Sequence, residues 1–186
     1  STLISGSISY LYYANRVFFF FFAIFAIATS IALFPMIAKA IKNKDENRAL
    51  HLMKKSSLIL FAVLSTSMLI GIVFNEFIVK LLFERGAFNS VDTQNTALIL
   101  TMYLMGLLPF GLAKIFSLWL YANEQQYLSA KISMKSLAWN IVFSLILIKP
   151  YGAAGLAFAS TLSGFILFFL TIKAFGFNKF ITMYKK

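Results

Sequence analysis

Two cationic side chains, Arg16 and Lys114, stand in or beside long apolar segments of this 186-residue chain. Arg16 precedes eighteen uncharged residues, Val17 to Phe34, about the length of one helical membrane crossing. A charge in such a segment costs roughly 2.5–3.5 kcal/mol at mid-depth, so it usually faces a partner, a cavity or the interface. The neighbouring Tyr12 suits an interfacial anchor. Equally, the guanidinium fork suits bidentate binding of an anion such as a lipid-linked pyrophosphate.

Lys114 lies more than two helical turns before the polar residue Asn123. Its ammonium group either faces a cavity or extends along the helix to the membrane surface. Pro109, flanked by Gly106 and Gly111, removes one helical hydrogen bond shortly before it, so we expect a kink there. Pro109 is therefore a candidate hinge.

The last two apolar segments contain polar side chains that could lie together, namely Asn140 and Ser144 in one and Ser160 and Ser163 in the other. They can act as hydrogen bonds between helices or as a weak cation site made of oxygen ligands, although no carboxylate is nearby. Small residues spaced four apart, from Gly155 to Ser163, predict close approach of a neighbouring helix.

Composition places the chain in the membrane class. It is 60% hydrophobic and only 12% charged, about half the charged share of a soluble domain. Helices are the expected form, because no strand-like alternation supports a barrel. The sequence predicts an all-α, polytopic transmembrane bundle with five spans, at residues 8–38 (broken near Pro35), 56–79, 94–122, 132–148 (stopped at Lys149-Pro150) and 152–175.

Basic residues predict the orientation. The stretches 39–55 and 123–135 and the C-terminal tail hold twelve of the seventeen Lys and Arg residues, against three in the opposite loops. The positive-inside rule places the twelve in the cytoplasm and residue 1 outside. This bias accounts for most of the net charge of +11, so we expect no nucleic-acid partner. Residues 43–55 form either a short interfacial helix or a solvated linker.

The outer loop contains turn and capping residues. Gly86 permits a tight turn, and Asn89 or Ser90 can cap the third span with Asp92 in its first turn.

Several classes of chemistry are excluded. The chain has no cysteine and a single histidine, His51, so disulfides, thiolate metal sites and multi-histidine centres are absent. No nucleophile–base pair, paired carboxylates or phosphate-binding glycine loop occurs, so we expect neither an enzyme nor a bound cofactor or metal. The chain begins with Ser almost inside an apolar segment, so we expect a piece of a longer protein.

Four motifs resemble the MurJ (MviN) lipid II flippase family. Residues 7–35, with Tyr-Tyr-Ala-Asn-Arg before Ala-Leu-Phe-Pro, resemble its eighth membrane helix. Residues 82–88 with Asp92-Thr93 resemble the loop before helix ten. Lys114 with Tyr121-Ala122 is similar to helix ten, and residues 152–161 resemble the start of helix twelve.

The resemblance implies helices eight to twelve of a fourteen-helix, two-lobe transporter of the multidrug/oligosaccharidyl-lipid/polysaccharide exporter superfamily, with the N-terminal lobe absent here. It implies alternating access that moves undecaprenyl-pyrophosphate-linked peptidoglycan precursor (lipid II) across the bacterial inner membrane. Arg16 would meet the pyrophosphate, with Asn15 and Lys114 in support. Its partners would be lipid II, membrane lipids and its own N-terminal lobe, with coupling to the membrane potential or Na⁺.

The chain departs from the family at three places. Phe18 to Phe22 replace a stretch like Gln-x-Pro-x-Gly, which removes the residues expected to bend that helix. Residues 123–126 form a more neutral link, and Ser144 stands where some relatives have an acid, which weakens a sodium site. The alternatives are a polysaccharide-lipid or multidrug exporter, a non-transporting membrane scaffold, and an enzyme acting on a polyprenyl phosphate.

Overall fold

The computed structural model describes residues 6–185, and every regular element in that range is helical. Lys186 of the basic tail and the outer position expected for residue 1 lie outside the described residues. The elements in chain order are α1 (Ser7–Phe22), the π-helical turn η1 (Ala23–Ile27), α2 (Ala28–Lys42), α3 (Glu46–Val73), α4 (Asn75–Phe83), α5 (Ser90–Leu104), α6 (Leu107–Ala122), α7 (Gln126–Phe175) and α8 (Phe177–Lys185).

Four helical stretches within residues 6–185 are long and apolar enough to cross a membrane: Ser7–Lys42, Glu46–Val73, Ser90–Ala122 and Gln126–Phe175. The last is 50 residues long, and Gly152 interrupts it with a non-helical backbone (φ 55°, ψ −130°). A positive φ is readily adopted only by glycine, so the reversal falls there and not at Lys149-Pro150 as expected. The two arms of α7 correspond to the expected segments 132–148 and 152–175.

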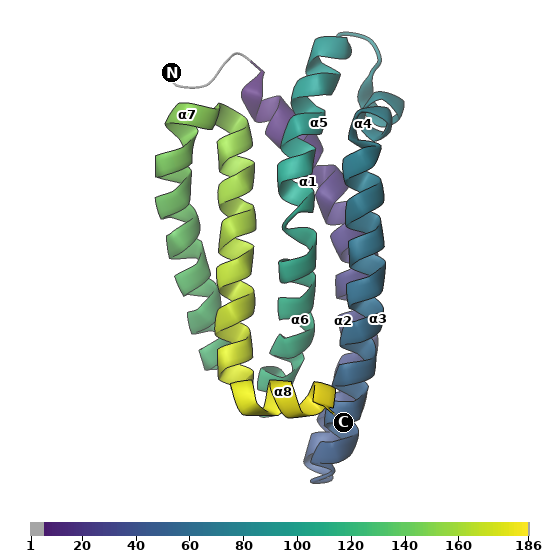
Figure 1. The fold of residues 1–186 in the computed structure, drawn as a ribbon, viewed down its shortest axis with the longest axis vertical. Helices are drawn as coiled ribbons and strands as arrows, with labels where there is room; N and C mark the ends of the chain where they lie inside the picture. The colour runs from purple at the N-terminus through teal and green to yellow at the C-terminus, as the bar shows by residue number, and fades with distance from the viewer. Residues whose placement is uncertain (1–5, 186) are drawn as a thin grey trace.

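The first apolar segment is continuous through Pro35. Pro35 lies inside α2, so the expected break near this residue is wrong. The irregularity falls earlier, at η1, directly after the phenylalanine run that ends at Phe22. A π-turn adds one residue to the helix and rotates the helical segment after it relative to the segment before it. In Figure 1, α1 accordingly leans across α5 while α2 runs beside α3.

The third apolar segment is interrupted one turn before Pro109. The Gly106 N–H bonds the Tyr103 carbonyl, which leaves the Met102 carbonyl without its usual helical donor. The Thr161 hydroxyl of α7 donates to that carbonyl instead. Pro109 then falls in the first turn of α6, where its missing N–H costs little. The kink expected at Pro109 is therefore a break at Met105–Gly106.

The bundle packs around α5 and α6, which lie at its centre in Figure 1. The second arm of α7 packs along α6, and α3 lies on the opposite side. Many of the fully buried large side chains belong to these two helices, among them Leu100, Leu104, Ile115 and Phe116.

The two arms of α7 approach closely at the small residues expected to allow it. A Cβ atom built on Gly155 would lie 2.3 Å from the Leu147 carbonyl oxygen of the other arm. Farther along, the Ser136 hydroxyl donates to the Ser163 carbonyl at 2.7 Å. The small face from Gly155 to Ser163 is confirmed as a close helix contact.

One end of the bundle carries α8 and the loop at residues 43–45, and we call it the basic end. α3 begins at Glu46, so most of the stretch 43–55 is the first part of a long helix, capped by the Asp45 carboxylate. α8 lies across this end in Figure 1. Lys179 of α8 forms an ion pair with Glu46 at 2.7 Å and lies 4.2 Å from the Trp119 ring centroid. α8 is thereby held to both α3 and α6.

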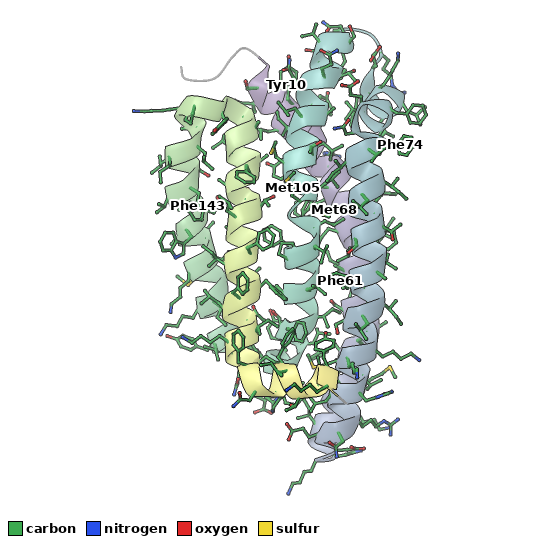
Figure 2. All side chains as sticks on the ribbon, viewed as in Figure 1. Tyr10, Phe61, Met68, Phe74, Met105 and Phe143 are labelled. Carbon is green, nitrogen blue, oxygen red and sulfur yellow. The ribbon has the colours of Figure 1, made fainter. Side chains whose placement is uncertain are left out.

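At the opposite end, Asn89 caps α5 as expected. Its side chain accepts hydrogen bonds from the backbone N–H groups of Val91 and Asp92, and the Asp92 carboxylate accepts from the Asn89 N–H. Tyr10 lies near the start of α1 (Figure 2). Its phenol donates a hydrogen bond to the Asp92 carboxylate at 2.6 Å, which joins α1 to α5. The cap thus holds the start of α1, the helix that carries Arg16.

We expect Asn89→Ala to lower the free energy of unfolding of the full-length protein by about 1 kcal/mol, because α5 loses its capping box. Thermal unfolding in detergent measures this loss. Ser90→Ala, at the next residue, is the matched control and should leave the melting temperature unchanged. Equal stability of the two variants would contradict this account of the cap.

Candidate functional site

Arg16 lies on an exposed stripe of α1. The stripe repeats every three to four residues and is otherwise apolar or aromatic; its large members are Ile8, Tyr12, Phe19 and Phe20. The opposite face, including Ala14, Val17 and Phe18, is buried against the rest of the bundle. The Arg16 guanidinium is therefore presented away from this lobe, toward whatever lies beside α1.

The guanidinium contacts one neighbouring side chain, Tyr12, one turn away. It donates a hydrogen bond to the Tyr12 phenol, and its central carbon lies 4.6 Å from the ring centroid. Within residues 6–185, no Asp or Glu lies close enough to form an ion pair with it. An unneutralised guanidinium in an apolar stripe can bind a phosphate anion with two parallel hydrogen bonds. Asn15, beside it, is half-buried.

Lys114 lies on α6 and is half-buried. Ala26 of η1 and Gly111 of α6 lie at the same height along the bundle axis, because a Cβ on Gly111 would lie 3.5 Å from the Ala26 Cβ. From that level Arg16 is ten residues away from the basic end, and Lys114 is three residues toward it. At 1.5 Å per residue the two cations differ in depth by about 20 Å. One pyrophosphate group cannot contact both at once.

The polar residues of α7 divide into two groups. The Asn140 amide donates to the Ser160 and Ser163 hydroxyls at 3.2 and 3.3 Å, so these three are brought together between the two arms. Ser144, one turn from Asn140, takes no part in these bonds. Among the described residues, no three acidic or histidine side chains gather in a way that could hold a metal ion. The arrangement is that of hydrogen bonds joining two membrane helices.

One feature of this region escaped sequence reasoning. The π-turn η1 begins seven residues after Arg16, in a sequence without glycine or proline. Such turns occur often at functional sites. Ala26, inside η1, is fully buried beside Gly111, so the irregular part of the first helix packs on the glycine that follows Pro109.

These helices, their length and their apolar surfaces define a multi-pass helical membrane protein, with a guanidinium on an exposed stripe that has no acidic partner within residues 6–185. A family model described as lipid II flippase MurJ matches residues 1–185, and the chain belongs to that family. It is 51% identical to a probable lipid II flippase MurJ of Helicobacter pylori, over all of this chain and 40% of that protein. A protein with the same description from Buchnera aphidicola is 32% identical, over 91% of this chain and 33% of that protein.

A solved structure agrees with the sequence relatives. The fold superposes on that of a lipid II flippase MurJ in an inward closed conformation, with a TM-score of 0.81 and 26% sequence identity. The match covers 97% of this chain and 41% of that one. The chain spans about two fifths of the length of the curated relatives it matches, so it corresponds to one part of such a protein.

Proposed function

We propose that this chain is the C-terminal lobe of a lipid II flippase, which moves the undecaprenyl-pyrophosphate-linked peptidoglycan precursor across the bacterial inner membrane. The observation that carries this proposal is the Arg16 guanidinium, exposed on an apolar stripe without an acidic partner among the described residues. A guanidinium without an acidic partner on an apolar membrane helix is costly unless it binds an anion. We take the pyrophosphate of lipid II as that anion, and membership of the lipid II flippase family supports this choice.

In this proposal Arg16 binds the pyrophosphate where α1 faces the central cavity, beside the absent N-terminal lobe. Lys114 is too far along the axis to share the ligand. At about 20 Å and an effective dielectric of 20, it adds roughly 0.8 kcal/mol of attraction. Lys114 therefore attracts the headgroup at long range as it moves, whereas Arg16 binds it with direct hydrogen bonds. Alternating access then exposes Arg16 to one side of the membrane at a time.

The orientation follows from charge. We place the basic end in the cytoplasm, with loops 39–55 and 123–135 and the tail, because positive residues are retained on that side. The protein transports its substrate without altering it chemically. We favour the membrane potential as the source of energy, since it acts on a positively charged cavity with about 2.3 kcal/mol per charge per 100 mV. The hydrogen bonds within the Asn140 cluster leave it less suited to Na⁺.

Complementation tests the proposal. The full-length gene is expressed in a bacterium whose own lipid II flippase can be switched off, and growth and peptidoglycan synthesis are followed. We expect the wild-type gene to restore both. A polysaccharide-lipid or drug exporter, or a scaffold, would leave the cells to lyse with lipid II accumulated, and that outcome would overturn the proposal.

A further inference from the structure

The first three membrane segments are each interrupted once. The first contains the π-turn η1, and the third breaks at Met105–Gly106. The second continues into α4 through Phe74, whose backbone is not helical (φ −106°, ψ 21°). Helices bend at such points, and hinges between moving parts of a protein consist of a few residues of this kind.

Contacts between helices give the relative height of these interruptions. A Cβ on Gly71 would lie 2.7 Å from a terminal carbon of Leu104, which places the end of α3 beside the end of α5. The Asn75 amide, just after Phe74, donates to the Thr101 hydroxyl at 2.7 Å. The interruption at Phe74 therefore lies beside the last turn of α5, directly before the break in the third segment.

The height of η1 follows from its contact with α6. Ala26 lies at the height of Gly111, and η1 begins three residues before Ala26. It therefore begins at about the height of Leu108, two residues beyond the break at Met105–Gly106. Counted along the third segment, the three interruptions fall within about two helical turns of one another. Together they define an oblique surface across the bundle.

On one side of this surface lie α1, α4, α5 and residues 84–89, which we call the cap unit. The Tyr13 ring of α1 packs on the Phe83 ring of α4 and on the Phe88 ring, with centroid distances of 4.7 and 5.4 Å. The hydrogen bond from Tyr10 to Asp92 joins α1 to α5. These contacts make the cap unit one packed body.

On the other side lie α2, α3, α6, α7 and α8, which we call the base unit. Lys179 joins α8 to both α3 and α6. The Ser57 and Tyr184 hydroxyls, 2.6 Å apart, add a second bond between α3 and α8. α2 packs on α3 and α6, and α7 packs along α6. The base unit is therefore held together independently of the cap unit.

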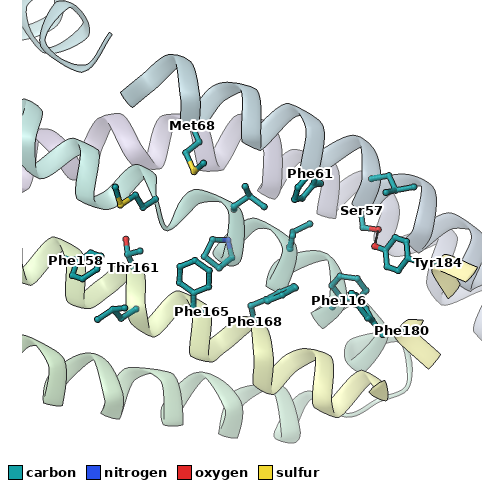
Figure 3. A pocket seen from close by; sticks show the side chains of 16 residues that line it. Ser57, Phe61, Met68, Phe116, Phe158, Thr161, Phe165, Phe168, Phe180 and Tyr184 are labelled. Atoms are coloured by element: carbon teal, nitrogen blue, oxygen red, sulfur yellow. Dashed lines mark hydrogen bonds between the residues drawn. The ribbon is translucent and has the colours of Figure 1, made fainter. Parts of the chain in front are cut away.

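Within residues 6–185, one side-chain hydrogen bond joins the two units, from the Thr161 hydroxyl of α7 to the Met102 carbonyl of α5. Figure 3 shows Thr161 turned toward the interrupted helix, in the wall of an apolar groove that Met105 and Pro109 also line. Pro109 has no N–H to donate to the Met105 carbonyl, so the backbone itself adds little stiffness at this point.

We propose that the cap unit tilts as one body against the base unit about these three interruptions, and that the Thr161 hydrogen bond holds it in the position seen in the structure. Arg16 belongs to the cap unit and Lys114 to the base unit. Arg16 lies about 10 Å from η1, so a kink of about 20° displaces it by about 4 Å. This consequence for ligand binding rests on the proposed function, whereas the tilt itself does not.

Distances between spin labels in the full-length protein, reconstituted in lipid nanodiscs, test the tilt. One pair of labels joins Val91 of the cap unit to Tyr151 of α7, and a second pair joins Ile59 to Tyr127 within the base unit; all four side chains are exposed. Val91 lies about 21 Å from the break, so a kink of about 20° moves it by about 7 Å. Thr161→Val removes the hydroxyl but keeps the shape of the side chain. It should change or broaden the Val91–Tyr151 distance by up to about 7 Å and leave the Ile59–Tyr127 distance unchanged.

Thr171→Val is the matched control. The Thr171 hydroxyl is also buried on the second arm of α7, but it bonds the Leu167 carbonyl of its own helix. This variant should change neither distance. An unchanged distance in the cap-to-α7 pair of Thr161→Val would overturn the proposal. An equal change in both pairs would also overturn it, because the whole bundle would then be distorted.

Hydrogen exchange of the wild-type protein provides a second test that needs no substitution. Amides in η1, at Phe74 and at Met105–Gly106 should exchange at one common rate, faster than amides in the middle of α3 and α6. Equal protection at the interruptions and in the middle of these helices would overturn the proposal.

Growth of flippase-depleted cells separates this proposal from the proposed function. If the wild-type gene fails to rescue growth while the label distances change as expected, the flippase function is wrong and the tilt stands. If the wild-type gene rescues growth while Thr161→Val leaves the distances unchanged, the tilt is wrong and the flippase function stands.

Discussion

Arg16→Ala in the full-length protein is expected to lower the rate of lipid II translocation by about ten- to 150-fold. A hydrogen bond to a charged group contributes roughly 1.5–3 kcal/mol, and the expected fold-change corresponds to the net loss of one such bond. Arg16→Lys keeps the charge but loses the planar fork, so its rate should fall between those of the wild type and the alanine variant. The measurement is rescue of growth in flippase-depleted cells, with translocation scored in the same strain.

Arg48→Ala is the matched control, because it removes a guanidinium that lies on the exposed surface of the basic end. It should support normal growth. Tyr12→Phe frees Arg16 from its one side-chain hydrogen bond while keeping the aromatic ring, and it should reduce translocation far less than Arg16→Ala. Full rescue by Arg16→Ala at normal protein levels would refute the anion-binding role.

Gly155→Ala is expected to destabilise the protein by about 2–3 kcal/mol, the upper part of the range for overpacking. In an ordinary helix, replacing glycine by alanine stabilises the helix by up to about 1 kcal/mol. The loss of stability expected for Gly155→Ala is therefore opposite in sign to the effect of helix propensity. The new Cβ would lie 2.3 Å from the Leu147 carbonyl oxygen, and a backbone atom beside the Gly152 reversal cannot move aside cheaply. Thermal unfolding of the full-length protein in detergent measures the change.

Gly71→Ala is the matched control for this substitution. A Cβ on Gly71 would meet a terminal methyl carbon of Leu104 at 2.7 Å, and that flexible side chain can rotate away. Its melting temperature should stay close to that of the wild type. If Gly155→Ala were as stable as Gly71→Ala, the two arms of α7 would be farther apart than the structure places them.

Local chemistry made several features predictable. Asn89 caps α5 because its amide oxygen accepts hydrogen bonds from backbone N–H groups of the first turn. Asn89 followed three residues later by Asp92 is a pattern that predicts such a cap from sequence. The small residues from Gly155 to Ser163 likewise revealed the contact between the α7 arms. Long apolar runs were enough to find the membrane helices and the helical fold class.

Features that depend on packing were not predictable. Pro35 removes one hydrogen bond but leaves α2 intact, while η1 interrupts the same segment without glycine or proline. The break at Met105–Gly106 depends on Thr161, which is more than fifty residues away and supplies the donor for the Met102 carbonyl. The position of α8 depends on Lys179, which contacts Glu46 and Trp119, partners that are distant in sequence.

The candidate site was only partly predictable. Arg16 was recognised because a charge beside a long apolar run is rare in any membrane helix. Its separation from Lys114 could not be read from the sequence, because the relative level of two helices depends on contacts such as that of Ala26 with Gly111. The sequence placed Asn140 and Ser160 in neighbouring apolar segments as possible hydrogen-bond partners, whereas the bond between them could be found only from the structure.

The most direct measurement is the fraction of lipid II that an externally added, lipid II-cleaving enzyme can reach in cells in which the full-length protein is depleted. If the protein is the flippase, this fraction should fall toward zero within a few generations while total lipid II rises, and re-expression should restore it. An accessible fraction that stays constant after the protein has disappeared would contradict the central claim.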